Sequence, residues 1–229
     1  MRVLITNDDG IHAPGLQALE AAVGQLGWES TIVAPFAEHS QCGHSVTTHQ
    51  PLKVEPLGPQ RYAVHGTPAD CVRIALFALD VKPDLVLSGV NAGGNMGQDL
   101  VISGTVAAAR EAAYHGVRGF ALSHYMIRTL PVNWDRTAVW VTRILAEMQA
   151  QPQPEKTFWN INLPHLPPGD DELPPRVPSH PARSPLNVSY IQDGKGYVYS
   201  ASYASRPRDP GSDVEACFGG NVAVSLLHV

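Results

Sequence analysis

Two adjacent carboxylates, Asp8 and Asp9, come directly after a run of four apolar or β-branched residues at positions 3–6. That run predicts a buried strand, and Asn7 and Gly10 on either side of the carboxylates indicate a turn at its end. Ligands of open α/β sheets bind just beyond the carboxyl ends of the strands. Neighbouring carboxylates repel one another unless a cation or a proton lies between them, and Mg²⁺, Mn²⁺ and Ca²⁺ prefer oxygen ligands. The pair therefore predicts a divalent-metal site, with a solvated turn or a carboxylate cap of the next helix as the alternative.

A polar loop at 36–50 follows a second predicted strand at 30–35, so we expect it at the same edge of the sheet as Asp8. Ser40 is the hydroxyl of greatest interest in this loop as a further oxygen donor. The three histidines of the loop lack the spacing of a zinc motif, and we interpret them as polar loop residues rather than metal ligands. They are His39, His44 and His49.

A glycine-rich segment follows the strand predicted at 85–87 and leads into an alanine-rich helix that begins at Ser103, Gly104 and Thr105. A glycine-rich backbone approaches an anion closely, and a helix N-terminus offers free N–H groups and a partial positive charge. These features predict a phosphate site, whereas a flexible loop before a Ser/Thr-capped helix is the alternative. The segment has neither the GK[ST] ending of a P-loop nor the G-x-G-x-x-G dinucleotide fingerprint. The residues expected past the strand are Ser88, Gly89, Asn91, Gly93, Gly94, Asn95 and Gly97.

The elements around these motifs alternate between strands and helices. A helix is predicted from Pro14 to a stop at Gly27, between the first two strands, which makes a right-handed parallel βαβ unit. A hairpin is predicted at 51–66 and a helix after Thr67, where Asp70 fits a capping box better than a catalytic role. The later elements are a strand at 119–123, a helix at 134–149 and a strand at 158–164. The whole pattern predicts an α/β, Rossmann-like three-layer fold with a mostly parallel central sheet.

The C-terminal part differs in composition. Residues 164–185 are dense in proline, and we expect an extended arm there without a regular central strand or helix. Tyrosines alternate through 190–204 around the turn Asp193-Gly194, which predicts a β-hairpin. We therefore divide the chain into an α/β core with the candidate catalytic site at 1–163 and an extension at 164–229, which comprises the arm, the hairpin and a C-terminal segment.

Composition excludes several classes of function. The 229 residues carry a net charge of -5 with 16% charged residues and no Lys/Arg cluster, which argues against a nucleic-acid surface. No run of about 18 apolar residues and no basic, apolar leader occurs, so we expect neither a membrane span nor a signal peptide. Cys42, Cys71 and Cys217 show no C-x-x-C spacing, which indicates a reducing, cytoplasmic compartment.

Five segments together resemble the SurE (survival protein E) family and stand in the family's order within residues 1–125. The segments are NDDG at 7–10, the loop around Ser40, GTPADCV at 66–72, SGVNAGGNMGQD at 88–99 and SGTVAAAREA at 103–112. The resemblance continues more weakly through NINLP at 160–164 and GSDVEACFGGNVAVSLL at 211–227. Val101-Ile102 stands where the family commonly has a tyrosine before S-G-T.

This resemblance implies a metal-dependent phosphomonoesterase that acts on nucleoside monophosphates as a 5′/3′-nucleotidase. It implies one divalent metal ion per subunit, Mg²⁺ or Mn²⁺. The implied metal ligands are Asp8, Asp9, Ser40 and Asn91, and Asp8, Asp9 and Asn91 are also expected to be catalytic. The implied phosphate contacts are Asn91, Asn95, Ser103, Gly104 and Thr105. The family further implies a homodimer or homotetramer in which the C-terminal arm is exchanged.

Three other functions remain alternatives at this point. A broad-specificity acid phosphatase or exopolyphosphatase would share the site, and a non-catalytic nucleotide-binding protein would use the glycine-rich loop without turnover. A phospho-receiver domain also binds Mg²⁺ with an acidic pair, but it needs an aspartate at the end of a central strand, where this chain has Ser88 and Asn91. The nucleophile, a metal-bound water or the carboxylate of Asp8 or Asp9, also stays open.

Overall fold

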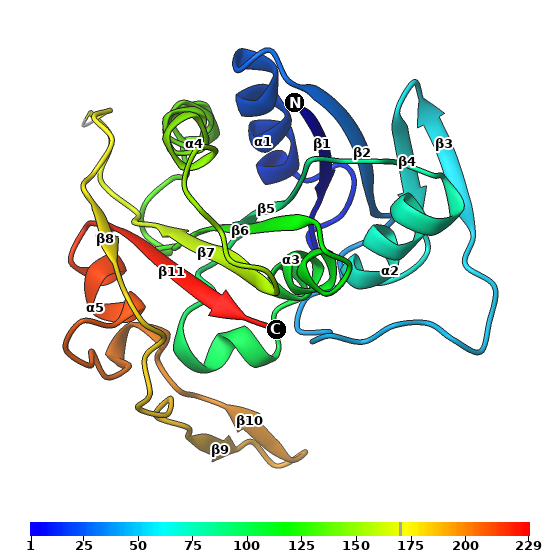
Figure 1. The fold of residues 1–229 in the computed structure, drawn as a ribbon. Coiled ribbons are helices and arrows are strands. Elements are labelled where there is room, and N and C mark those ends of the chain that lie inside the picture. Colours follow the sequence, from blue (N-terminus) through cyan, green and yellow to red (C-terminus); the bar gives the residue numbers. More distant parts are fainter. Residues whose placement is uncertain (170) are drawn as a thin grey trace.

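A nine-stranded sheet runs through the molecule in the order β3-β4-β2-β1-β5-β6-β7-β11-β8 (Figure 1). The computed structural model describes residues 1–169 and 171–229. The strands are β1 (Arg2–Thr6), β2 (Glu29–Pro35), β3 (Val54–Gly58), β4 (Arg61–Val64), β5 (Leu85–Ala92), β6 (Arg118–His124), β7 (Thr157–Leu163), β8 (Arg176–Pro178) and β11 (Val222–His228). The six strands from β4 to β7 in this order are parallel, whereas β3 and β11 are antiparallel to their inner neighbours and β8 is parallel to β11.

Helices cover both faces of the sheet and make the three-layer α/β fold predicted from the sequence. On one face lie α1 (Pro14–Gln25) and α4 (Trp134–Met148), and on the other lie α2 (Pro68–Arg73) and α3 (Gly104–Tyr114) (Figure 1). The remaining helical segments are η1 (Ile74–Ala78), which continues α2, η2 (Gly97–Val101), η3 (Tyr203–Ser205) and α5 (Asp213–Phe218). Among the described residues, no helix combines the length and the apolar character that a membrane span needs.

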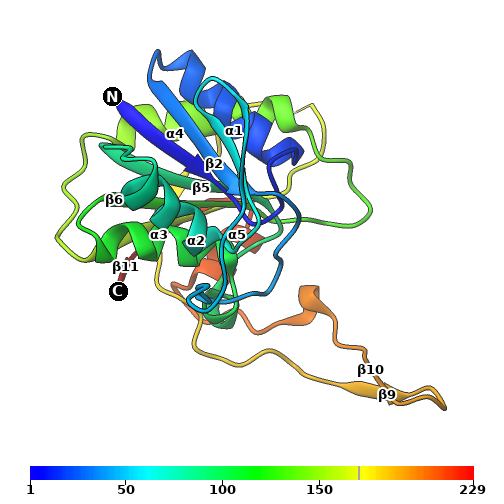
Figure 2. The same ribbon diagram turned by 90° about the vertical axis from the view of Figure 1, so that its right-hand side faces the viewer.

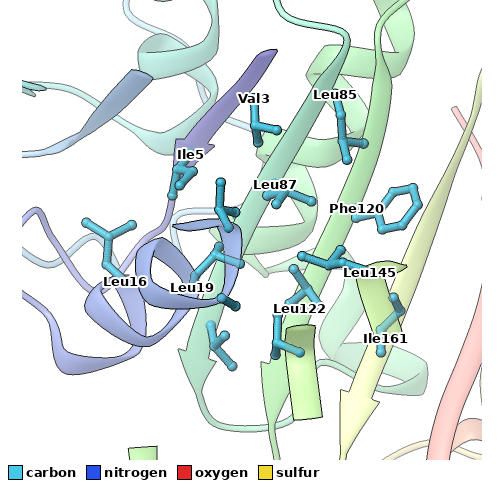
Figure 3. Packing of buried hydrophobic residues seen from close by; sticks show 14 of the residues in the cluster. Val3, Ile5, Leu16, Leu19, Leu85, Leu87, Phe120, Leu122, Leu145 and Ile161 are labelled. Atoms are coloured by element: carbon cyan, nitrogen blue, oxygen red, sulfur yellow. The ribbon is translucent and has the colours of Figure 1, made fainter. Parts of the chain in front are cut away.

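The largest apolar core lies between the sheet and the α1–α4 layer (Figure 3). Leu19 of α1 and Leu145 of α4 pack there against Leu87 and Leu122 of the central strands, and all four side chains are fully buried. The second core lies under α2 and α3, where Leu4 and other small or branched residues fill the space. Burial on both faces explains why the central strands read as short continuous apolar runs, and it leaves the carboxyl edge of the sheet for polar groups.

The strand β1 occupies the middle of the parallel part, between β2 and β5. Its Ile5 pairs in register with Ile32 of β2 and Leu87 of β5. Because these strands are parallel, the segments that follow β1, β2 and β5 all leave the sheet at the same edge. The predicted convergence of the three polar segments is therefore a property of the fold.

The strand β5 is longer than predicted, because it extends from Leu85 to Ala92. Ser88, Gly89 and Asn91 therefore lie within the strand, and their expected position beyond it is wrong. The register against β6 shifts between Ser88 and Asn91, so the strand continues past an irregularity. At Gly89 the φ angle is +139°, and a Cβ atom would lie 2.2 Å from the carbonyl oxygen of Leu122, so no side chain fits here.

The hairpin of β9 (Tyr190–Gln192) and β10 (Tyr197–Tyr199) projects away from the rest of the molecule (Figures 1 and 2). Its turn is closed as predicted, with the Asp193 amide donating to the carbonyl oxygen of Gly196 over 3.1 Å. In the described residues of the proline-rich segment, the short edge strand β8 is the part that joins the sheet. The last strand, β11, returns beside β7 in the main sheet, whereas the six-residue helix α5 before it was not predicted.

Candidate active site

Asp8 joins the end of β1 to the beginning of α3. Its side chain is buried, and Thr105 donates to it twice: the hydroxyl to Oδ1 over 2.6 Å and the backbone N–H to Oδ2 over 3.1 Å. Burial raises the pKa of Asp8, although the hydrogen bonds from Thr105 oppose that shift. A Cβ atom on Gly104 would lie 2.9 Å from Cβ of Asp8, so a glycine at this position permits the approach.

Asp9 contacts the neighbouring strand β5, whereas Asp8 contacts α3. Its Oδ2 accepts a hydrogen bond of 3.1 Å from the backbone N–H of Ala92, at the end of β5. Burial, followed by the charges of Asp8 and Glu38, raises the pKa of Asp9 to about 6. Asp8 and Glu38 thus lie close enough to Asp9 to repel its charge, and a bound cation would relieve this repulsion.

The Ser40 loop is attached directly to Asp8. The backbone N–H of His39 donates to the carbonyl oxygen of Asp8 over 2.8 Å, so the structure brings Ser40 to the end of β1 as predicted. The Ser40 hydroxyl donates to Oε1 of Glu38 over 2.5 Å. Glu38 is a carboxylate at this edge that our sequence reasoning did not select, although an acid two residues before the candidate ligand was a usable signal.

Asn91 lies near the end of β5, next to the residue that binds Asp9. Its Nδ2 donates to the carbonyl oxygen of Gly93 over 2.8 Å, and Oδ1 is the atom of this amide that can serve a cation. Asp8, Asp9, Ser40 and Asn91 together supply carboxylate, hydroxyl and amide oxygens. This donor chemistry fits Mg²⁺ or Mn²⁺.

The candidate metal ligands do not include histidine or cysteine. Within residues 1–169 and 171–229, no three His, Cys, Asp or Glu side chains are grouped so that they could hold a metal ion. His44, in the Ser40 loop, places Nε2 at 2.7 Å from Oε2 of Glu111. The candidate metal site therefore depends on two acidic residues and two neutral oxygen donors.

The helix α3 begins at Ser103, Gly104 and Thr105 as predicted, and Ser103 is its N-cap, which is the feature that the alternative interpretation expected. The Ser103 hydroxyl accepts a hydrogen bond of 3.1 Å from the backbone N–H of Val106. The next two residues, Gly104 and Thr105, contact Asp8, so the positive end of the helix points toward the acidic pair. The structure thus brings the predicted phosphate segment and the predicted metal ligands together at one place.

Asn95 reaches the same edge but is buried, and its contacts come from strands far away in the sequence. Its Nδ2 donates to Oγ of Ser123, and its backbone is held by Asn160 and Asn162 of β7. We did not select these three partners from the sequence. Two asparagines at alternate positions of an otherwise apolar strand were the available signal, because such residues share one face of a sheet.

Glu111 of α3 is a second group that sequence reasoning missed. Its buried carboxylate accepts hydrogen bonds from Nε of Arg73 (2.5 Å) and from the Nε2 atoms of His44 (2.7 Å) and His115 (2.8 Å). Burial alone would raise the pKa of Glu111, but these three donors outweigh it and lower the pKa to about 2. Through His44, the carboxylate anchors the loop that carries Ser40.

Comparisons with known proteins agree over almost the whole chain. A family model described as "Survival protein SurE" matches residues 3–175. A Synechocystis protein described as a putative 5′-nucleotidase is 46% identical over 100% of both chains, and a Rhizorhabdus wittichii protein named 5′-nucleotidase SurE is 39% identical over 100% of this chain and 93% of its own. The crystal structure of the SurE protein from Aquifex aeolicus matches with a TM-score of 0.86 at 32% identity, over 100% of this chain and 93% of that one.

Proposed function

Because the chain belongs to the SurE family, we propose that it is a divalent-metal-dependent phosphomonoesterase that hydrolyses nucleoside monophosphates to a nucleoside and phosphate. The observation that carries this proposal is the contact of Asp8 with Thr105. It places an acidic pair suited to a cation against a helix N-terminus suited to an anion. The names of the relatives support the nucleotide monophosphate as the substrate class.

Each part of the site has a separate role in this proposal. Asp8, Asp9, Ser40 and Asn91 would hold one Mg²⁺ or Mn²⁺ ion, which when bound neutralises phosphate charge and lowers the pKa of a coordinated water. At the N-terminus of α3, Ser103 and Gly104 would contact the phosphate oxygens directly. Thr105, whose N–H and hydroxyl both donate to Asp8, would contact them only by giving up one of these hydrogen bonds. Asn91 and Asn95 add amide contacts to the same phosphoryl group. The charge that develops on these oxygens is stabilised by fixed donors, which is the larger part of catalysis in such a site.

The proposal is tested by phosphate release after removal of metal with EDTA and readdition of Mg²⁺ or Mn²⁺. The substrates are a set of nucleoside monophosphates, p-nitrophenyl phosphate and polyphosphate. Asp8→Asn should abolish release and leave the fold intact. Asp84→Asn is the matched control, because Asp84 is exposed, bonds Arg2 at the opposite edge of the sheet and should be dispensable.

The outcomes separate the alternatives. Metal-dependent release that is highest on nucleotides and is lost in Asp8→Asn supports the nucleotidase. Equal phosphate release from all substrates would indicate a phosphatase without nucleotide preference. Phosphate release that is highest from polyphosphate would indicate an exopolyphosphatase. An active Asp8→Asn enzyme would refute the site. No release with any metal would point to a non-catalytic nucleotide-binding protein, which mass spectrometry of a retained ligand would test.

We also propose that the projecting hairpin is exchanged between subunits in a homodimer or homotetramer. Large apolar side chains are exposed on both of its strands, and an isolated two-stranded hairpin is marginally stable in water. These residues are Tyr190, Ile191, Tyr197, Val198 and Tyr199. Light scattering is the test: deletion of residues 188–200 should convert the oligomer to a smaller species, and a wild-type monomer would overturn the proposal.

A further inference from the structure

The peptide groups of Asn95 are held by two asparagine side chains of β7. Oδ1 of Asn162 accepts the Asn95 N–H over 2.8 Å, and its Nδ2 donates to the Asn95 carbonyl oxygen over 3.0 Å. Nδ2 of Asn160 donates to the same carbonyl oxygen over 2.9 Å. Both backbone polar groups of one residue are thus satisfied by side chains of a strand some 65 positions later.

The side chain of Asn95 is oriented by a third residue. Its Nδ2 donates to Oγ of Ser123 in β6 over 2.8 Å, and this contact is buried. The amide nitrogen carries two hydrogens, and within the part of the chain that the structure describes the second one has no acceptor, which leaves it for a group such as a phosphate oxygen. In the sheet, Ser123 pairs with Asn91 of β5 on one side and with Asn162 of β7 on the other. The candidate metal ligand Asn91 and the group that orients Asn95 are therefore at one level of the sheet.

This polar group lies where an apolar core would otherwise continue. Asn160, Asn162 and Ser123 are fully buried, while Phe158, two residues before Asn160 on the same face, packs in an apolar cluster. Oδ1 of Asn160 is buried and has no hydrogen-bond partner among the described residues. A buried amide with one unpaired end destabilises the fold, so packing does not account for an asparagine here. Among the described residues, the polar partner of the Asn160 side chain is the carbonyl oxygen of Asn95.

We infer that Asn160, Asn162 and Ser123 are positioning residues, which hold Asn95 in the geometry that contacts the phosphoryl group of the substrate. The inference rests on the proposed function and deepens it. The two β7 amides fix the backbone of the glycine-rich segment, and Ser123 fixes the direction of the Asn95 side chain. None of the three touches the substrate, so each acts through Asn95.

The test compares Asn162→Ala and Ser123→Ala with the control Ser225→Ala. Ser225 is also buried, lies on the neighbouring strand in register with Asn160 and bonds Ser179, away from Asn95. For each variant, kcat, KM, the inhibition constant of inorganic phosphate, the half-saturating Mn²⁺ concentration and Tm are measured. Asn162→Ala should lower kcat/KM and weaken phosphate inhibition by about 100-fold. Ser123→Ala keeps the contacts to the Asn95 backbone and should disturb folding less. We expect it to lower kcat/KM and to weaken phosphate inhibition, each by about five- to tenfold.

A purely structural role makes different predictions. It would lower Tm in all three variants and leave phosphate inhibition as in the wild type. Wild-type phosphate inhibition in folded Asn162→Ala, or in Ser123→Ala if the former does not fold, would overturn the inference. Under the positioning role, Ser225→Ala keeps wild-type phosphate inhibition, and the Mn²⁺ requirement stays the same in every variant. Failure of the wild-type protein to release or bind phosphate with any metal would instead overturn the proposed function, and this inference with it.

Discussion

The hydroxyl of Thr105 donates a hydrogen bond of 2.6 Å to Oδ1 of Asp8, across 97 positions of the sequence. One oxygen of the acidic pair is thereby fixed by the first turn of α3. The proposed metal ligand Asp8 and the proposed phosphate contacts of α3 are consequently coupled, because a movement of α3 would move Asp8 as well.

Thr105→Val should separate this contact from packing, because valine keeps the shape of threonine and removes the donor. The buried Asp8 oxygen would lose its shortest hydrogen bond, which costs about 1–3 kcal/mol. We also expect kcat/KM to fall by the factor that corresponds to this free energy, because the Asp8 carboxylate is no longer oriented. The measurements are urea unfolding and nucleotidase kinetics. Thr137→Val, at a fully buried position in α4, is the control that should lose stability and keep kcat/KM.

Gly104→Ala should disturb the site without removing any functional group. The new Cβ would lie 2.9 Å from Cβ of Asp8 and 3.0 Å from Sγ of Cys42, so Asp8 or α3 must shift. A misplacement of about 1 Å can reduce the rate by about 100-fold, and we expect a loss of that order. Gly24→Ala in α1 meets no atom within 4 Å and should instead stabilise the protein by about 0.5–1 kcal/mol without a change in rate. Equal kinetics for the two variants would contradict the prediction.

The sequence predicted the elements whose signals are local. Thr67 and Asp70 form the predicted capping box, α3 begins at the predicted residues, and the apolar run at β1 is a buried strand. Chain order and parallel pairing were then enough to place the acidic pair, the Ser40 loop and α3 at one edge. These predictions needed no knowledge of any contact between distant residues.

The unpredicted features depend on contacts between distant elements. The extension of β5 past its irregularity is possible because Gly89 passes close to Leu122 of β6, which nothing near Gly89 in the sequence indicates. In the sequence, Glu111 is one polar residue of an alanine-rich helix. Its role as an anchor of the Ser40 loop depends on hydrogen-bond donors from α2 and from that loop. The helix α5 is a single short segment after a serine cap, too short for a periodic signal.

His124 should make the protein less stable at mildly acidic pH. Burial, with smaller contributions from His165 and Arg136, lowers the pKa of His124 from 6.5 to about 4. The unfolded chain therefore binds this proton more readily, so the contribution to stability is complete above pH 6.5 and is lost as the pH falls toward 4. The loss approaches about 3 kcal/mol. The free energy of urea unfolding should fall between pH 7 and pH 4 in the wild type and should fall less steeply in His124→Asn. Equal dependence on pH in the two proteins would contradict the prediction.

Glu111→Gln should weaken both the fold and the anchoring of the Ser40 loop. The variant keeps the side-chain shape but loses the charge that three donors share, so we expect a loss of roughly 2–4 kcal/mol. The pKa of Glu111 is about 2 in the folded state against 4.5 in the unfolded chain, so its contribution is complete above pH 4.5 and lost as the pH falls to about 2. The variant should lack this dependence in urea unfolding and, because His44 is released, should need more Mn²⁺ for half-maximal activity.

Glu147→Gln is the matched control, because Glu147 pairs with Arg176 at the surface, where such a pair contributes about 0–1 kcal/mol. If Glu111→Gln and Glu147→Gln lost the same stability, the buried carboxylate would have no special role in the fold. If Glu111→Gln lost stability and kept the wild-type Mn²⁺ requirement, Glu111 would stabilise α3 without holding the Ser40 loop in place. A raised Mn²⁺ requirement in Glu111→Gln alone would establish that α3, whose first turn we propose as the phosphate site, also positions a metal ligand through Glu111.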